Sequence, residues 1–255
     1  MAMDDGNVRY RVEIARPEQI GEAQRLRYRI FAEELGARLA HADEQLDRDE
    51  FDEHCRHLLV RDLTTGRLVA GTRVLDQAGA CAAGRFYSQG EFEMADVLSL
   101  PGRFVEVGRT CVDPGYRNGA VIATLWQGIA GLIRHWHIDY LFGCASVPFN
   151  GAGDTFGHAV IRQLMERHLD TDIRARPLEP LAPRAALPAG LSPRMPPLLR
   201  TYVNLGARAC GAPCWDPTFG VADVLMLLDL RQLNPRFARH FLPGFAAAPR
   251  EPAFA

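Results

Sequence analysis

The sequence contains no lysine, so all 29 of its basic side chains are arginine. These arginines nearly balance 31 acidic residues, and the formal net charge of −2 excludes the basic field with which proteins attract nucleic acid. Arginine makes bidentate contacts with carboxylates and phosphates. We interpret its exclusive use here as the codon bias of a GC-rich genome, because composition alone seldom indicates function.

Long apolar runs are also missing. No segment approaches the roughly 20 apolar residues that span a bilayer, and the N-terminal sequence Met-Ala-Met-Asp-Asp lacks the apolar core of a secretory signal. We therefore expect a cytoplasmic protein whose six cysteines are reduced. The pair Cys210-x3-Cys214 has no second Cys/His pair with matching spacing, so we expect no metal site.

What the sequence does contain is the hydrophobic periodicity of a mixed α/β protein. It predicts strands at residues 8–15, 57–62, 67–75, 103–112, 140–146 and 221–230. It predicts helices at residues 17–35, 119–136, 155–168 and 198–205, with a further short helix over 88–96. Seven prolines in residues 177–197 are incompatible with a helix or a central strand and predict a covering loop. We expect a single domain over residues 1–245 and a disordered tail at 246–255.

The segment from Glu106 to Ala120 predicts a strand, a tight loop and the start of a helix. The strand carries a carboxylate at Glu106 and a guanidinium at Arg109, and the N-terminus of the following helix attracts phosphate. Such a junction suits an acyl thioester whose phosphorylated arm lies over the loop. The segment therefore indicates an acyltransferase.

The order of these elements resembles the GNAT acyltransferase superfamily, which implies a central, mostly antiparallel sheet flanked by helices. That superfamily usually wraps the pyrophosphate of coenzyme A with the motif Gln/Arg-x-x-Gly-x-Gly/Ala. Here the frame that starts at Arg117 places Ala120 and Ile122 at the glycine positions, and a β-branched residue hinders close backbone approach. A phosphopantetheine arm on acyl carrier protein carries one phosphodiester and no pyrophosphate, so it requires a less close approach of the loop backbone. We therefore expect an acyl carrier protein donor and no tightly bound cofactor. The residues expected to contact the arm are Val112, Arg117, Asn118, Gly119 and Ala120.

The N-terminal half resembles the acyl-homoserine lactone synthases, which use acyl carrier protein donors. Their pattern of Arg-x3-Phe, Asp-x2-Asp, a later Arg and Glu-x2-Arg is matched here, although the Trp that follows their first helix is missing. The matching residues are Arg27 and Phe31, Asp49 and Asp52, Arg73, and Glu106 and Arg109.

Across nearly its whole length, the sequence resembles the ornithine N-acyltransferases of ornithine-lipid synthesis. The matching segments are residues 107–112, 116–122, 141–146, 197–202 and 215–225. The resemblance implies transfer of a 3-hydroxyacyl group from acyl carrier protein to the α-amine of ornithine, which yields a lyso-ornithine lipid. The alternatives are an N-acyltransferase for another amino acid such as glycine, a lactone synthase, a coenzyme A-dependent acetyltransferase, and a non-catalytic module that binds acyl carrier protein. Because the product is amphipathic, transient contact with the inner membrane surface is a further hypothesis.

Acyl transfer to an amine needs a base, and Glu106 is the candidate; the alternative is a strand Glu that faces solvent or pairs with Arg109. Alternation places Arg109 on the opposite face of the strand unless a β-bulge intervenes. Such a bulge also turns a backbone amide, that of Cys111 or Val112, toward the thioester oxygen. Tyr202 either protonates the departing thiolate or packs in the core. Cys111 is also a candidate nucleophile for a covalent route, although a buried Cys usually acts as a small apolar residue.

An acidic cluster surrounds Asp49 and Asp52, and most of its side chains are expected to be solvated. These two carboxylates either bind the side-chain ammonium of ornithine or brace arginines by ion pairs. Arg27 and Arg73 either grip the acceptor carboxylate in bidentate fashion or pack against Asp52. Arg109 is placed at the acyl-chain entrance or against Asp49 and Asp52. The remaining expected substrate contacts are Phe31 and Ser146.

Overall fold

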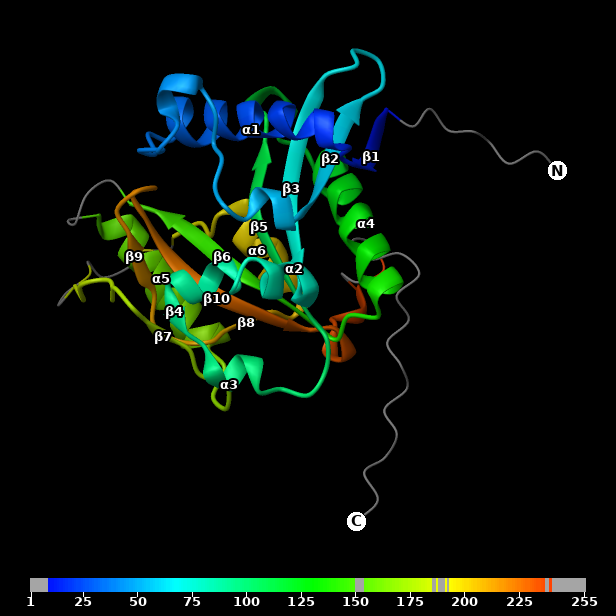
Figure 1. Cartoon of the computed structure of the whole chain (residues 1–255). Helices are drawn as coiled ribbons and strands as arrows, with labels where there is room; N and C mark the ends of the chain where they lie inside the picture. The colour runs from blue at the N-terminus through cyan, green and yellow to red at the C-terminus, as the bar shows by residue number, and fades with distance from the viewer. Residues whose placement is uncertain are drawn as a thin grey trace.

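The computed structural model describes residues 9–149, 154–184, 187, 191, 193–236 and 239. Eight strands form one sheet in the order β1-β2-β3-β5-β6-β10-β8, and β9 also pairs with β10 (Figure 1). Neighbouring strands are antiparallel except β5 and β6, so the mostly antiparallel sheet expected from the sequence is confirmed. The strands are β1 (Tyr10–Ile14), β2 (Arg56–Asp62), β3 (Leu68–Asp76), β5 (Phe104–Val112), β6 (Tyr140–Pro148), β8 (Arg208–Ala209), β9 (Cys214–Asp216) and β10 (Val221–Asp229). The predicted tail at 246–255 lies outside the described residues, as does part of the proline-rich segment.

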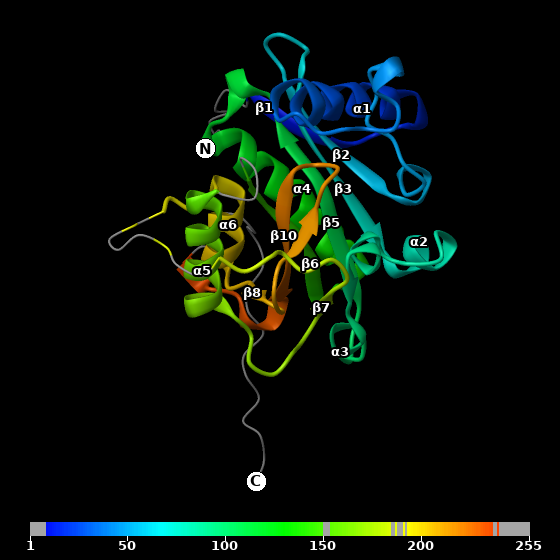
Figure 2. The same cartoon turned by 90° about the vertical axis from the view of Figure 1, so that its left-hand side faces the viewer.

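Helices cover both faces of the sheet (Figures 1 and 2). The helices α4 (Gly119–Trp136), α5 (Thr155–His168) and α6 (Pro197–Leu205) pack on one face, and α1 (Ile20–Tyr28) packs on the other. The alternation of β2 explains this arrangement: Leu58 belongs to the core cluster that includes Trp126 of α4, whereas its neighbour Leu59 belongs to the cluster that includes Leu26 of α1. Burying each such side chain contributes about 1.5–3 kcal/mol. Among the described helices, none combines the length and apolar character needed to cross a membrane.

The helix predicted over residues 17–35 is divided into three parts. A 3₁₀ turn at Pro17–Gln19 leads into α1, which passes into a π-helical turn at Arg29–Glu34 before Gly36 adopts a φ of +79°. Glycine at this positive φ ends the helix as predicted. Wider π-helical turns often lie next to functional sites, and this one carries Phe31, whose ring lines the cavity described below.

The prediction of one short helix over residues 88–96 is wrong. This segment contains a 3₁₀ turn at Tyr87–Gly90, the strand β4 (Phe92–Glu93), which pairs with β7 (Arg176–Pro177), and the beginning of helix α3 (Ala95–Leu98). Helix α2 (Gln77–Ala82) was not predicted, because its small residues produce no amphipathic period. Its N-terminus is capped by Asp76, whose side chain accepts a hydrogen bond from the backbone N–H of Gly79.

The one parallel pair of the sheet opens into a fork. Hydrogen-bonded register between β5 and β6 covers three residue pairs and ends at Glu106 and Phe142, although both strands continue (Figure 1). Gly143 lies where the strands separate. A Cβ atom there would lie 2.2 Å from the carbonyl oxygen of Val107, so only glycine permits this close approach. The fork leaves space within the sheet itself.

Candidate active site

A cavity of about 410 Å³ occupies the fork between β5 and β6. Its polar end lies on the α1 face of the sheet, and its apolar end lies on the α6 face, where Leu198, Leu199 and Tyr202 form the wall. The polar residues of its lining include Arg73, Tyr87, Glu106, Arg109, Cys144, Ser146, Asp216 and Asp223. The cavity therefore connects a charged compartment with an apolar one through the sheet.

Glu106 lies in the wall of the cavity with only 3% of its surface exposed. One carboxylate oxygen accepts a hydrogen bond from the backbone N–H of Tyr87 at 2.7 Å. The other accepts from the backbone N–H of Ser88 at 2.8 Å and from the Ser88 hydroxyl. Burial raises the pKa of Glu106, and the hydrogen bonds from Ser88 and Tyr87 offset only part of this effect. Glu106 is thus a fixed carboxylate with an enhanced affinity for a proton.

Arg109 reaches the same compartment because β5 contains a β-bulge. The register of β3 with β5 shifts between Gly71 and Arg73, and Arg109 adopts a φ of +51°. From the sequence, Glu106 and Arg109 could share a face of the strand only if a β-bulge lay between them or next to them, and the bulge is present. The guanidinium of Arg109 lies 4.8 Å from the ring centroid of Tyr87 and 4.6 Å from that of Phe219.

Arg27 and Asp52 form the centre of a buried ion-pair network. Arg27 donates from both terminal nitrogens to the two carboxylate oxygens of Asp52, each at 2.8 Å, and its Nε lies 2.9 Å from the Asp47 carboxylate. Gln24 also donates to Asp52. Burial would raise the pKa of Asp52, but the hydrogen bonds and charges of Arg27 and Arg73 outweigh it and hold the pKa well below its ordinary value. Arg27 and Asp52 do not line the cavity.

Arg73 and Arg109 extend this network to the cavity wall. Arg73 donates to Asp49 and, at 2.9 Å, to Asp52. Arg109 lies 3.4 Å from Asp49 and 3.3 Å from Asp47. Burial would raise the pKa of Asp49, yet the charge of Arg73 and its hydrogen bond lower it overall. Three arginines therefore offset three aspartates, and of the six side chains only Arg73 and Arg109 are part of the cavity lining.

Tyr202 forms part of the apolar end. Its ring packs edge-on against Trp126 with the centroids 5.6 Å apart. Burial raises the pKa of Tyr202 to about 12, although a hydrogen bond with the Thr110 side chain acts in the opposite direction. The phenol is therefore neutral at physiological pH and retains its proton. Two further predicted contacts, Phe31 and Ser146, also line the cavity.

Cys111 lies in a separate apolar cluster beneath α1 and is absent from the cavity lining. Burial raises the pKa of its thiol to about 12, which disfavours the thiolate form. The expected donor-arm residues lie between the last residue of β5, Val112, and the first turn of α4, also outside the lining. Asn118 caps this helix by accepting from the N–H groups of Ala120 and Val121, both at 3.1 Å. Arg117 donates to Glu34 at 2.6 Å and to the carbonyl of Val112.

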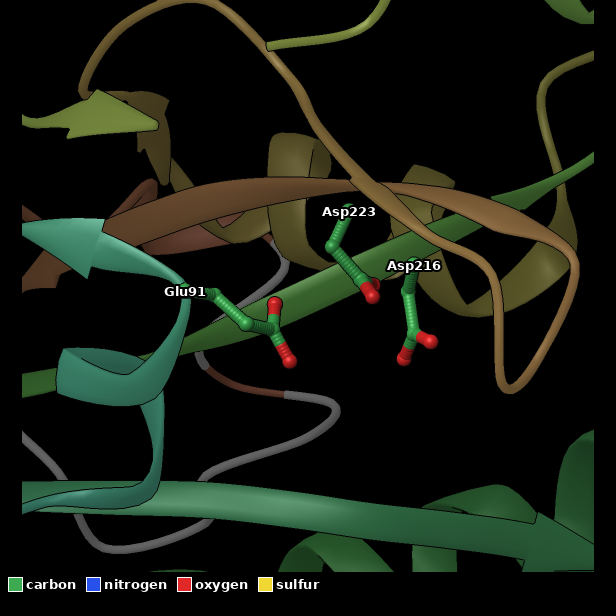
Figure 3. Close-up of side chains that lie close together, drawn as sticks. All are labelled: Glu91, Asp216 and Asp223. Carbon is green, nitrogen blue, oxygen red and sulfur yellow. The ribbon is translucent and has the colours of Figure 1, made fainter. Parts of the chain in front are cut away.

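Three acidic residues at the polar end were not among the predicted site residues. Glu91 follows the 3₁₀ turn that Glu106 holds, Asp216 ends β9, and Asp223 lies on β10 (Figure 3). The sequence offers one signal for the last two. The turn Pro217-Thr218-Phe219-Gly220 joins two strands and thereby brings their aspartates to the same end of a hairpin.

Comparisons with known proteins identify the fold and the family. The family model "Acetyltransferase (GNAT) domain" matches residues 26–127. The solved structure of the AHL synthase LasI shares the fold, with a TM-score of 0.50 at 14% identity over 94% of this chain and 98% of that one. An L-ornithine N(alpha)-acyltransferase of Brucella abortus is 36% identical over 239 residues, which cover 87% of this chain and 84% of the relative. One of Rhodobacter capsulatus is 33% identical over 89% of this chain and 92% of the relative. The resemblance inferred from the sequence is thus confirmed, and the chain belongs to the acyltransferase family of the L-ornithine N(alpha)-acyltransferases.

Proposed function

We propose that this protein transfers an acyl group from a thioester to the α-amine of L-ornithine, with formation of N-acylornithine. The observation that carries the proposal is the cavity in the β5–β6 fork, which joins a charged compartment to an apolar one. The charged compartment suits an amino acid, and the apolar one suits an acyl thioester. The names of the relatives, which are L-ornithine N(alpha)-acyltransferases, supply the acceptor.

In the proposed mechanism, Glu106 takes a proton from the α-ammonium of the acceptor, directly or through a water molecule. The amine nitrogen then attacks the thioester carbonyl carbon and forms a tetrahedral intermediate. A backbone N–H at the β5 bulge stabilises its oxyanion; Cys111 and Val112, which the sequence suggested for this role, are not among the residues that line the cavity. When the C–S bond breaks, Tyr202 donates its phenolic proton to the departing thiolate.

Arg73 and Arg109 are the proposed contacts of the acceptor carboxylate, because they are the members of the ion-pair network that line the cavity. Their pairing with Asp49 fixes both guanidiniums before substrate arrives. Arg27 and Asp52, which lie behind them, act as positioning residues.

We propose acyl carrier protein as the source of the donor. The side chain of Asn118 already occupies the N–H groups of Ala120 and Val121, which leaves fewer amides for a pyrophosphate. A 3-hydroxyacyl-acyl carrier protein is expected to react at least about tenfold more efficiently than the matching coenzyme A thioester, a difference of about 1.4 kcal/mol.

Mass spectrometry of the products, with purified protein, L-ornithine and each donor in turn, measures this ratio and tests the proposed function. Equal kcat/KM values for the two donors would refute the carrier preference. If neither donor yields N-acylornithine, the proposed function is wrong.

Substitution of Tyr202 by phenylalanine tests the proposed proton donor. It is expected to lower kcat about 10²-fold, because the thiolate then leaves without a positioned acid. Tyr140→Phe is a matched control, since it removes a buried hydroxyl from a different cluster, where Arg231 donates to it. Steady-state kinetics should show an unchanged kcat for the control. A similar small loss of kcat in both variants would show that Tyr202 serves only to pack the core.

A further inference from the structure

Three carboxylates gather at the polar end of the cavity. Oxygen atoms of Glu91, Asp216 and Asp223 all lie within 4.8 Å of one another, and the side chains approach from three different segments (Figure 3). Asp216 and Asp223 line the cavity. Negative charges at this separation repel one another, so the cluster requires a proton or a cation.

Asp223 supplies a second, independent observation. It is 4% exposed, and one of its oxygens accepts a hydrogen bond from the Ser146 hydroxyl at 2.6 Å. Its other oxygen receives no hydrogen bond from any residue in the described part of the chain. The carboxylate points into the space shared with Glu91 and Asp216 (Figure 3). The side chain is buried, but this oxygen faces the cavity and has no donor from the described residues, which indicates that a ligand supplies the hydrogen bond.

The cluster differs from the other acidic group of the site. Asp49 and Asp52 form ion pairs with arginines, whereas within the described residues no basic side chain lies within ion-pair distance of Glu91, Asp216 or Asp223. Burial raises the pKa of both Glu91 and Asp223, although the charge of Arg109 acts in the opposite direction.

A short chain of contacts connects the cluster to Glu106. The Ser88 hydroxyl that donates to Glu106 lies 3.2 Å from the thiol sulfur of Cys144, which in turn lies 3.2 Å from a carboxylate oxygen of Glu91. The proposed base and the acidic cluster are therefore close neighbours. This spacing suits an amino acid that carries one amine for reaction and a second cationic group further along its side chain.

We propose that Glu91, Asp216 and Asp223 form a subsite that binds the side-chain ammonium of the acceptor and thereby selects a diamino acid. The inference rests on the proposed function and assigns the selection of ornithine to residues outside the Asp49 and Asp52 pair. Each carboxylate offers a charge-assisted acceptor to one ammonium, which has three donors. An acceptor with a neutral side chain leaves the carboxylates unpaired and is rejected.

The test compares L-ornithine with L-norvaline, which has the same carbon chain without the terminal amine. Asp223→Asn keeps an acceptor for Ser146 but removes the charge. It is expected to raise KM for ornithine about tenfold or more, with a smaller change in kcat and little change for norvaline. Glu93→Gln is the matched control: it removes one charge two residues from Glu91 on an exposed side chain, and it should leave the ornithine-to-norvaline ratio unchanged.

Thermal unfolding separates a binding role from a structural one. Asp223→Asn removes a buried carboxyl that repels its two neighbours whenever it is ionised, so Tm is expected to rise in the variant, and ornithine should raise Tm in the wild type more than in the variant. Asp216→Asn, at a partly exposed position, provides a second variant if the first fails to fold.

Three results would overturn the subsite. The first is an unchanged ornithine-to-norvaline ratio in Asp223→Asn while the wild type acylates ornithine. The second is loss of wild-type activity with EDTA and its recovery with Mg²⁺ or Ca²⁺, which would make the cluster a metal site. The third is failure of the wild type to produce any N-acylornithine, which overturns the proposed function as well.

Discussion

Glu106→Gln is expected to lower kcat by about 10²- to 10⁴-fold, the range that general-base catalysis contributes. The variant keeps the size of the side chain but cannot accept the proton of the α-ammonium. Its amide NH₂ also faces a backbone N–H of the turn at Tyr87 or Ser88, where the carboxylate accepts hydrogen bonds. Single-turnover rates with 3-hydroxyacyl-acyl carrier protein and ornithine measure the effect on chemistry, and circular dichroism establishes that the variant is folded.

The pH profile distinguishes a base from a purely structural carboxylate. Burial raises the pKa of Glu106, and a base must be ionised to act, so the acid limb of kcat/KM should lie above the ordinary Glu value of about 4.3. Ser88→Ala serves as the control. It removes a hydrogen bond that lowers the pKa of Glu106, so the acid limb should move to higher pH while activity persists. An acid limb that remains in Glu106→Gln would place the base elsewhere in the cavity.

Arg27→Ala is expected to reduce the free energy of unfolding by about 3–5 kcal/mol, the cost of removing one partner from a buried ion pair. The substitution leaves Asp52, which is 6% exposed, without its bidentate partner. Arg29→Ala is the matched control, because Arg29 lies two residues further along and is exposed. Urea unfolding of the three proteins measures the difference. Similar losses in both variants would show that the pair contributes little.

The same network determines how stability responds to acid. The folded protein holds the pKa of Asp52 and Asp49 below their unfolded values. Their contribution to stability is therefore fully present above the unfolded pKa of about 3.9 and is lost as the pH falls toward the folded values. In Arg27→Ala this loss below pH 4 should be smaller, because part of the stabilisation is already absent.

The sequence was sufficient for the elements with a strong hydrophobic period. Helix α4 has the predicted limits, because its apolar side recurs over five turns and Asn118 marks its start. Helix α2 and strand β8 were missed, since a helix of six small residues and a strand of two residues carry no period. The segment over 88–96 was misassigned because its structure depends on Glu106, distant in sequence, which holds the turn at Ser88.

The candidate site was predictable where family motifs carry it. Glu106, Arg109, Arg73 and Tyr202, chosen from motif spacing, all line one cavity. Arg27 and Cys111 lie behind the cavity wall instead of in it. Their position depends on which face of the sheet packs against α1, and motif spacing does not predict that face. The acidic cluster escaped prediction for a related reason. Glu91 comes from a turn and its two partners from a hairpin more than a hundred residues later, and only the folded chain brings them together.

The fork between β5 and β6 interrupts the hydrogen bonding of the sheet. Beyond Glu106 and Phe142, β5 remains hydrogen-bonded to β3, and β6 to β10, but not to each other. A pantetheine arm carries amide groups of its own and can enter such a gap as an added strand. The donor would then hydrogen-bond to both β5 and β6 and connect the two halves of the sheet. Resistance of the chain to proteolysis and to heat should therefore rise when the proposed donor, an acylated acyl carrier protein, binds to it, even without an acceptor.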